Sequence, residues 1–157
     1  MKIYFAGPLF SSAERSFNVR IGKLLEESGH EVWLPQEHEP RKKRARQIFL
    51  KDVEGIEWAD AVVANMDGPD PDSGTCWECG YAYNRKPVIV FRTDFRSASD
   101  TGSAPYNLML SESASARINI PFGTEAALAT AILKALRQFV EKPGRRQPAN
   151  SLRKESK

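Results

Sequence analysis

The sequence has few residues of the kinds that build metal sites or disulfide frameworks. Its 157 residues include only two cysteines, Cys76 and Cys79, and two histidines, His30 and His38. A tetrahedral structural zinc site needs four ligands, and the two pairs lie in different parts of the chain. We therefore expect no metal ion. With 41% hydrophobic residues, a chain of this length can bury one sizeable core without disulfides.

Long hydrophobic runs are also absent, and so is any internal repeat. No apolar run approaches the length that crosses a bilayer. The N-terminal segment MKIYFAGP has the pattern of a short strand and a turn, and it lacks the apolar segment and cleavage site of a secretory signal. We therefore expect a cytoplasmic protein.

Positive charge is concentrated at the C-terminal end. The formal net charge is +3, but residues 142–157 alone carry +5, which leaves −2 for residues 1–141. We expect one domain over residues 1–141, followed by a flexible basic tail. A second basic cluster, Arg41–Arg46, lacks interleaved aromatic residues, which favours a solvated helix start over nucleic-acid binding.

Cys76 and Cys79 have the C-x-x-C spacing that is found in redox-active pairs. Helical geometry would place both sulfur atoms on one face. A thioredoxin-like role therefore stays open, although we favour two reduced cysteines packed against a sheet.

Strand-like and helix-like patterns alternate along the chain. Strands are expected at residues 2–6, 31–34, 60–65, 87–91 and 117–120, and helices at residues 13–28, 41–58, 75–84 and 124–140. The alternation predicts an α/β domain with a doubly wound sheet of five parallel strands and helices on both faces. Because ligands bind beyond the carboxyl ends of such strands, residues 4–10, 67–78 and 93–107 should form one cleft. We interpret the long polar connection 93–106 as a lid.

Glu78 is the first candidate for chemistry, because it follows a strand and a turn-rich loop at the expected start of a helix. In the first turn, unpaired amides and the helix dipole would favour its ionised form, which a nucleophile needs. The spacing Thr75-x-x-Glu78 equally fits a capping box, as does Ser11-x-x-Glu14 before the first helix. We adopt the capping interpretation for Glu14. Glu78 differs because no basic residue lies three or four positions away to neutralise it.

Asp52 is the second candidate. It lies beside the expected apolar stripe of Phe49, Val53 and Ile56 and has no basic neighbour one helical turn away, a setting that tends to raise the pKa of a carboxyl group. A raised pKa suits a proton donor. The alternative is an aspartate at the helix edge that faces water.

Four segments together resemble the nucleoside 2-deoxyribosyltransferase family. They are IYFAGPLF at residues 3–10, DVEGI at 52–56, DSGTCWECGYA at 72–82 and NLM at 107–109, in the order of the family. The resemblance implies a flavodoxin-like fold and transfer of 2-deoxyribose from one nucleobase to another. The reaction would be a retaining double displacement through a covalent sugar ester, without a cofactor.

The resemblance also implies roles for single residues. Glu78 would be the nucleophile, Tyr4 would orient it, and Asp52 would protonate the departing base. Asp72 and Asn107 would hold the 5′-hydroxyl of the sugar. Further substrate contacts are expected from Gly7, Phe10 and Met109. Without the resemblance, Tyr4 has the ordinary interpretation of a core residue and Asp72 that of a turn former.

The resemblance implies deoxynucleosides and free nucleobases as partners, and a homo-oligomer, a dimer or a trimer of dimers, in which a neighbouring subunit completes the cleft. One alternative is a relative that hydrolyses deoxynucleoside 5′-monophosphates. Those enzymes have small hydroxyl residues where this chain has Asp72 and Asn107, and an aspartate there would repel a phosphate. Another alternative is a nucleotide-binding module without chemistry, which would tolerate Glu78→Ala.

Overall fold

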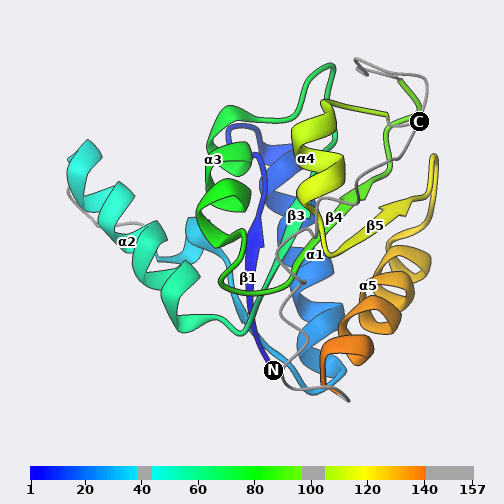
Figure 1. Cartoon of the computed structure of the whole chain (residues 1–157), viewed down its shortest axis with the longest axis horizontal. Helices are drawn as coiled ribbons and strands as arrows, with labels where there is room; N and C mark the ends of the chain where they lie inside the picture. The colour runs from blue at the N-terminus through cyan, green and yellow to red at the C-terminus, as the bar shows by residue number, and fades with distance from the viewer. Residues whose placement is uncertain (39–43, 97–104, 141–157) are drawn as a thin grey trace, which may run out of the picture.

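The computed structural model describes residues 1–38, 44–96 and 105–140, and a parallel sheet forms its centre (Figure 1). The five strands are β1 (Lys2–Ala6), β2 (Glu31–Trp33), β3 (Ala61–Asn65), β4 (Val88–Arg92) and β5 (Ala116–Asn119). They are ordered β2-β1-β3-β4-β5 and every neighbouring pair is parallel. This arrangement confirms the predicted fold class.

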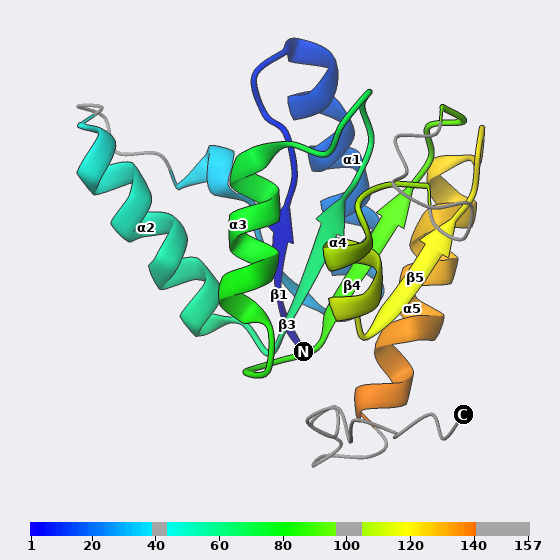
Figure 2. The same cartoon turned by 45° about the horizontal axis from the view of Figure 1, so that its top comes forward.

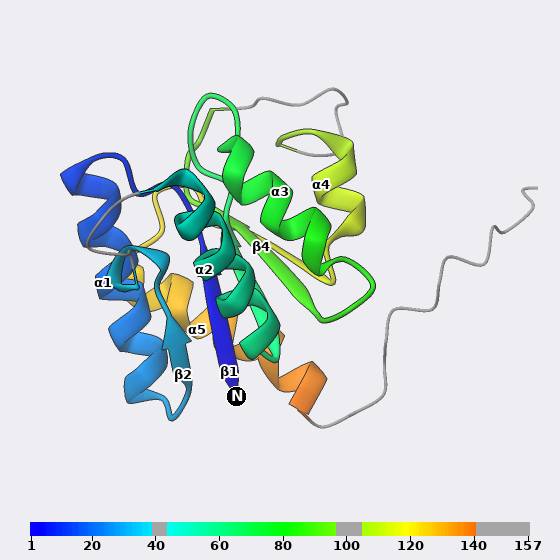
Figure 3. The same ribbon diagram turned by 90° about the vertical axis from the view of Figure 1, so that its left-hand side faces the viewer.

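Helices cover both faces of the sheet. They are α1 (Ser12–Glu27), α2 (Ala45–Trp58), α3 (Ser73–Ala82), α4 (Leu108–Ser113) and α5 (Glu125–Val140), with a short 3-10 turn, η1 (Pro35–Glu37). Helices α1 and α5 pack on one face, and α2, α3 and α4 lie on the other (Figures 2 and 3). No helix in the described ranges is both long enough and apolar enough to span a membrane.

The alternation of side chains in β1 decides which residues face which layer. Ile3 and Phe5 belong to the core under α1 and α5, whereas Tyr4 and Ala6 belong to the core under α2 and α3. Strands β3 and β4 are buried along their whole length, as expected for central strands covered on both faces. Tyr4 is therefore fixed on the side of the sheet where α3 lies.

The first helix confirms its predicted cap. The amide of Glu14 donates to Ser11 Oγ over 3.2 Å, and the amide of Ser11 donates to Glu14 Oε2 over 2.7 Å. The helix ends before Gly29, whose φ of 87° lies in the left-handed region that glycine adopts readily.

Some expectations differ from the structure. Helix α4 and the turn η1 were not predicted, and Phe49, expected in the core, is 39% exposed because the N-terminal half of α2 projects from the sheet (Figure 1). Residues 41–43 of the basic cluster, residues 97–104 of the expected lid, and the C-terminal tail lie outside the described residues.

Candidate active site

Tyr4 and Glu78, which are 74 positions apart in the sequence, meet where α3 crosses the sheet. The Tyr4 hydroxyl donates a hydrogen bond of 2.5 Å to Glu78 Oε1, a length typical of a hydroxyl bonded to a carboxylate. The tyrosine is fully buried. Burial and the nearby charge of Glu78 raise the pKa of Tyr4, so the hydroxyl keeps its proton and acts as the donor. This bond fixes the direction of the carboxyl group.

Helix α2, which carries Asp52, lies beside α3 (Figure 3). Two contacts join the helices. The rings of Phe49 and Trp77 are 5.3 Å apart, and the Tyr81 hydroxyl donates to Glu57 Oε1 over 2.6 Å. Asp52 lies between these contacts on α2, as Glu78 does on α3.

The charge of Asp52 acts on both Tyr4 and Glu78, where it contributes to raising their pKa values. Tyr4, Asp52 and Glu78 therefore share one electrostatic environment. The role of Asp52 as a proton donor stays a prediction.

The pKa of Glu78 is raised to about 8. Burial is the largest cause. The hydrogen bond from Tyr4 acts in the opposite direction, and the charges of Asp52 and Asp72 raise the pKa further. The expectation that the start of the helix keeps Glu78 ionised is therefore wrong, because the dominant effects in this setting favour the protonated form.

The helix start does not stabilise the charge of Glu78, because α3 begins earlier in the sequence than predicted. Asp72, not Thr75, is the N-cap of α3, and its Oδ2 accepts from the amide of Thr75 over 2.8 Å and from the Thr75 hydroxyl over 3.1 Å. The helix begins at Ser73, which places Glu78 in the second turn, where the amides already have helical partners. Glu78 therefore does not form the capping box with Thr75. Aspartate is itself a preferred N-cap residue, and this signal was present in the sequence.

Gly7 and Phe10 lie in the loop that follows β1. A Cβ atom at Gly7 would lie 3.2 Å from the Cβ of Asn65, so the glycine allows the loop to approach the end of β3 closely. Phe10 is 78% exposed, and its amide donates to Glu14 Oε2 over 2.9 Å. Its ring is therefore open to contact rather than packed in the core.

Asn107 and Met109 lie at the start of α4, a helix that contacts α3. The side chain of Asn107 caps α4 by accepting from the amide of Met109 over 2.9 Å. Met109, 71% exposed, lines a groove of about 380 Å³ between α3 and α4, together with Cys76 and Gly80. Glu78 is not among the lining residues and projects from the opposite face of the helix. Within one chain, Met109 and Glu78 are therefore separated by α3.

The two cysteines carry no sign of redox activation. Both are free, and Cys79 is buried. Burial raises the pKa of both thiols, and the charges of neighbouring acidic residues raise them further. A reactive thiol needs the opposite shift. In the described ranges, no three His, Cys, Asp or Glu side chains are grouped so that they could hold a metal ion.

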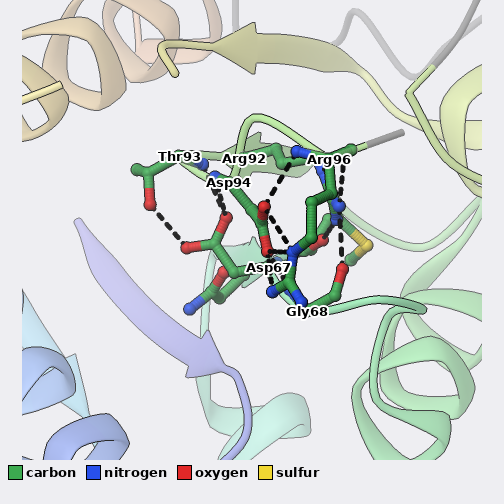
Figure 4. A network of polar contacts seen from close by, with 8 residues as sticks. Asp67, Gly68, Arg92, Thr93, Asp94 and Arg96 are labelled. Carbon is green, nitrogen blue, oxygen red and sulfur yellow. Dashed lines mark hydrogen bonds and ion pairs between the residues drawn. The ribbon is translucent and has the colours of Figure 1, made fainter. Parts of the chain in front are cut away.

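A polar network at the carboxyl ends of β3 and β4 was not predicted (Figure 4). Asp67 accepts from the amide and the hydroxyl of Thr93, each over 2.6 Å, and from the amide of Asp94 over 2.8 Å. Arg92 lies in the same network with its guanidinium fully buried. Its partners are backbone carbonyls, which leave no side-chain pattern in a sequence.

The matching family model, which describes nucleoside 2-deoxyribosyltransferases, covers residues 3–109. The chain belongs to the nucleoside 2-deoxyribosyltransferase family. The matched range includes Tyr4, Asp52, Asp72 and Glu78 and ends at Met109. Membership and fold together make this protein an enzyme of the deoxyribosyltransferase and glycosidase group, which acts on nucleosides and nucleobases.

Solved structures agree with this family. A 2-deoxyribosyltransferase from Bacillus psychrosaccharolyticus is 30% identical with a TM-score of 0.63, over 82% of this chain and 90% of its own. A 2-deoxyribosyltransferase from Leishmania mexicana is 25% identical with a TM-score of 0.63, over 90% and 98%. A conserved protein from Enterococcus faecalis V583 is 28% identical with a TM-score of 0.69, over 85% and 98%. No curated protein matches the chain.

Proposed function

We propose that this protein transfers 2-deoxyribose between nucleobases, with Glu78 as the nucleophile. The observation that carries the proposal is the 2.5 Å bond from Tyr4 to Glu78, in a setting where Asp52 acts electrostatically on both groups. A carboxylate held by a buried phenol and accompanied by a second acid has the composition of a retaining glycosyl-transfer site. Family membership supplies the sugar and the class of leaving group.

In the first half of the reaction, a Glu78 oxygen bonds to C1′ of the nucleoside. The bond from C1′ to the base nitrogen breaks, and its electron pair leaves with the base. Asp52 gives its proton to the departing base, which prevents negative charge from accumulating on the base. The products of this half are a free base and a deoxyribosyl ester of Glu78.

In the second half, a nitrogen of an incoming base attacks C1′ of the ester. The bond from C1′ to Glu78 breaks, its electrons return to the carboxylate, and the incoming base gives its proton to Asp52. Two displacements at one carbon restore the original configuration. Water in place of the second base would give hydrolysis.

The reaction needs an ionised Glu78 and a protonated Asp52 at the same time. Two partly buried carboxyl groups that interact prefer to share one proton, since ionising both brings like charges together. The hydrogen bond from Tyr4 favours the arrangement with the charge on Glu78. One proton on this pair is therefore the state in which we propose that catalysis begins.

Asp72 supports a free nucleoside as the substrate. Its Oδ2 is engaged by Thr75, while no donor among the described residues reaches its Oδ1. That oxygen can accept from a sugar hydroxyl, whereas a 5′-phosphate placed beside a carboxylate would be repelled.

The test is a base-exchange assay with a 2′-deoxynucleoside and a second free base, followed by chromatography. We expect the exchanged nucleoside to form faster than free deoxyribose, and we expect Glu78→Gln to abolish both products. A parallel assay uses the corresponding 5′-monophosphate. Preferred release of base from the monophosphate would contradict the proposed substrate, and release of sugar without exchange would make the protein a hydrolase.

We also propose that the protein is a homo-oligomer. Several large apolar side chains on the α2, α3 and α4 face are exposed, among them Leu50 at 49%, Trp77 at 46% and Met109 at 71%. Large apolar surface of this kind is typical of protein interfaces.

A further inference from the structure

We propose that Arg92 is a positioning residue that locks the loop after β3 to the loop after β4 and so fixes the sugar-binding oxygen of Asp72. This inference rests on the proposed function for the identity of the ligand. The mechanism above does not use Arg92, and the reaction does not require its charge.

Arg92 is 0% exposed, and its guanidinium joins three backbone carbonyls (Figure 4). It donates to the carbonyl of Met66, to the carbonyl of Gly68 over 2.8 Å, and twice to the carbonyl of Arg96, over 2.7 and 3.2 Å. Met66 and Gly68 belong to the segment after β3, and Arg96 to the segment after β4. One side chain therefore bridges two loops.

The two loops are also joined in the opposite direction. Asp67 accepts from two amides and the hydroxyl of the β4 loop, and Asp94 accepts from the amide of Gly68 over 3.3 Å. Each segment thus donates to and accepts from the other. Arg96 pairs with Asp94 and completes the network.

The need of buried loop carbonyls for hydrogen-bond donors explains why an arginine is buried at this position. Removing a guanidinium from water is costly, and an apolar side chain would fill the same space at lower cost. The carbonyls of irregular loops, however, need donors when they are buried. Arginine provides five N–H groups in a planar fork, which a lysine ammonium cannot reproduce. The side chain is therefore suited to holding loop backbone rather than to packing alone.

A stiff segment, residues 69–71, connects Gly68 to Asp72, so the position of Gly68 restricts the position of Asp72. Gly68 has φ of 115°, a conformation that favours glycine, and in this conformation its carbonyl faces Arg92 and its amide faces Asp94. The next residues are Pro-Asp-Pro-Asp, and the prolines Pro69 and Pro71 fix φ at two of them. Pro71 is buried, and Asp72 follows it as the N-cap of α3.

The Tyr4–Glu78 bond does not depend on this connection in the same way. Tyr4 lies on β1, and no hydrogen bond of Arg92 reaches either residue in the described part of the chain. Loss of the Arg92 clamp should therefore weaken recognition of the 5′-hydroxyl more than bond breaking at C1′.

The experiment compares Arg92→Lys with the wild type on two substrates, a 2′-deoxynucleoside and its 2′,5′-dideoxy analogue, which lacks the hydroxyl assigned to Asp72. The wild type should prefer the 5′-hydroxylated substrate in kcat/KM. Arg92→Lys should lose about tenfold of this preference, mostly through KM, as should Asp72→Ala, and the double variant should lose no more than the single ones. Arg117→Lys changes an exposed arginine on β5 and serves as the control.

If Arg92 had a purely structural role, Arg92→Lys would lower kcat/KM for both substrates by the same factor. An unchanged preference for the 5′-hydroxylated substrate in Arg92→Lys would therefore overturn the proposal. Amide hydrogen exchange supplies a readout that needs no activity. The amides of Gly68, Thr93 and Asp94 should exchange about tenfold or more faster in Arg92→Lys, while those of β1 stay protected. Unchanged exchange would contradict the clamp itself. Absence of turnover in the wild type would instead contradict the proposed function.

Discussion

At the scale of single residues, the environment of Glu78 opposes the ionised state that its proposed role requires. A nucleophile must be ionised, yet burial and two neighbouring acids raise its pKa to about 8. Tyr4 is the group that acts in the opposite direction. The neighbours of Glu78, rather than its place in the helix, therefore decide how much of the protein is ready to react at neutral pH.

The shared proton makes a prediction about the pH profile. Because the reactive pair holds one proton, we expect kcat/KM to be bell-shaped, and the alkaline limb, on which the pair loses its last proton, should lie near pH 8. Tyr4→Phe removes the donor to Glu78 and should move this limb to higher pH, with a loss of about ten- to hundredfold in kcat/KM. Asp52→Asn leaves Glu78 as the only acid of the pair, so the alkaline limb should disappear. An alkaline limb that persists in Asp52→Asn would contradict this account.

The raised pKa also predicts a gain in stability from Glu78→Gln. Because the folded state holds its proton up to about pH 8 and the unfolded chain releases it near its ordinary pKa, the native protein loses stability as pH rises through this window. A neutral glutamine removes that loss and can still accept from Tyr4. We expect about 1 to 3 kcal/mol of stabilisation at pH 8 and little at pH 4, measured by urea unfolding. Equal stabilisation at both pH values would contradict the assigned pKa.

At the scale of elements, the sequence predicts strands better than helix starts. Strand β1 has the predicted bounds because its alternation is strict, and the apolar run of β4 marks a central strand. Helix α4 was missed because its six residues show no full period. The predicted start of α3 was wrong because Thr75 and Glu78 have the spacing of a capping box, whereas Asp72 is the N-cap residue in the structure. Local patterns therefore fitted two helix starts, and the structure has the one that Asp72 caps.

Two glycines in helices give a matched prediction about packing. A Cβ atom at Gly55 of α2 would lie 2.5 Å from Nε1 of Trp33, whereas a Cβ at Gly80 of α3 would meet nothing within 4 Å. Gly55→Ala should therefore cost about 1 to 3 kcal/mol of stability. Gly80→Ala should stabilise by about 0.5 to 1 kcal/mol, since alanine favours the helix. Thermal unfolding of both variants tests this, and similar shifts would contradict the packing described for α2.

At the scale of the whole molecule, the topology brings together residues that no local sequence pattern connects. Tyr4 and Glu78 become neighbours because β1 and β3 are adjacent and α3 returns over them. The rule that ligands bind at strand ends predicted that these segments would meet. It could not predict the Arg92 network, since carbonyl acceptors look alike at every position. It also gave no indication that α3 separates Met109 from Glu78 within one chain.

The exposed apolar face formed by α2, α3 and α4 predicts association of subunits. We expect light scattering to give a molar mass of at least two chains of 17.6 kDa at micromolar concentration. Leu50→Glu should lower that mass, whereas Lys134→Glu, an exposed change on α5, should not. A single-chain mass at all concentrations would contradict the proposed oligomer.

The most direct test of the account is the mass of the intact protein after rapid mixing with a 2′-deoxynucleoside and acid quenching. We predict a gain of one deoxyribosyl group, located on Glu78 by peptide mapping, that disappears when a second base is added and never forms in Glu78→Gln. The same adduct on Glu78→Gln or on another residue, or turnover by a protein that never carries the sugar, would contradict the claim that Glu78 is the nucleophile.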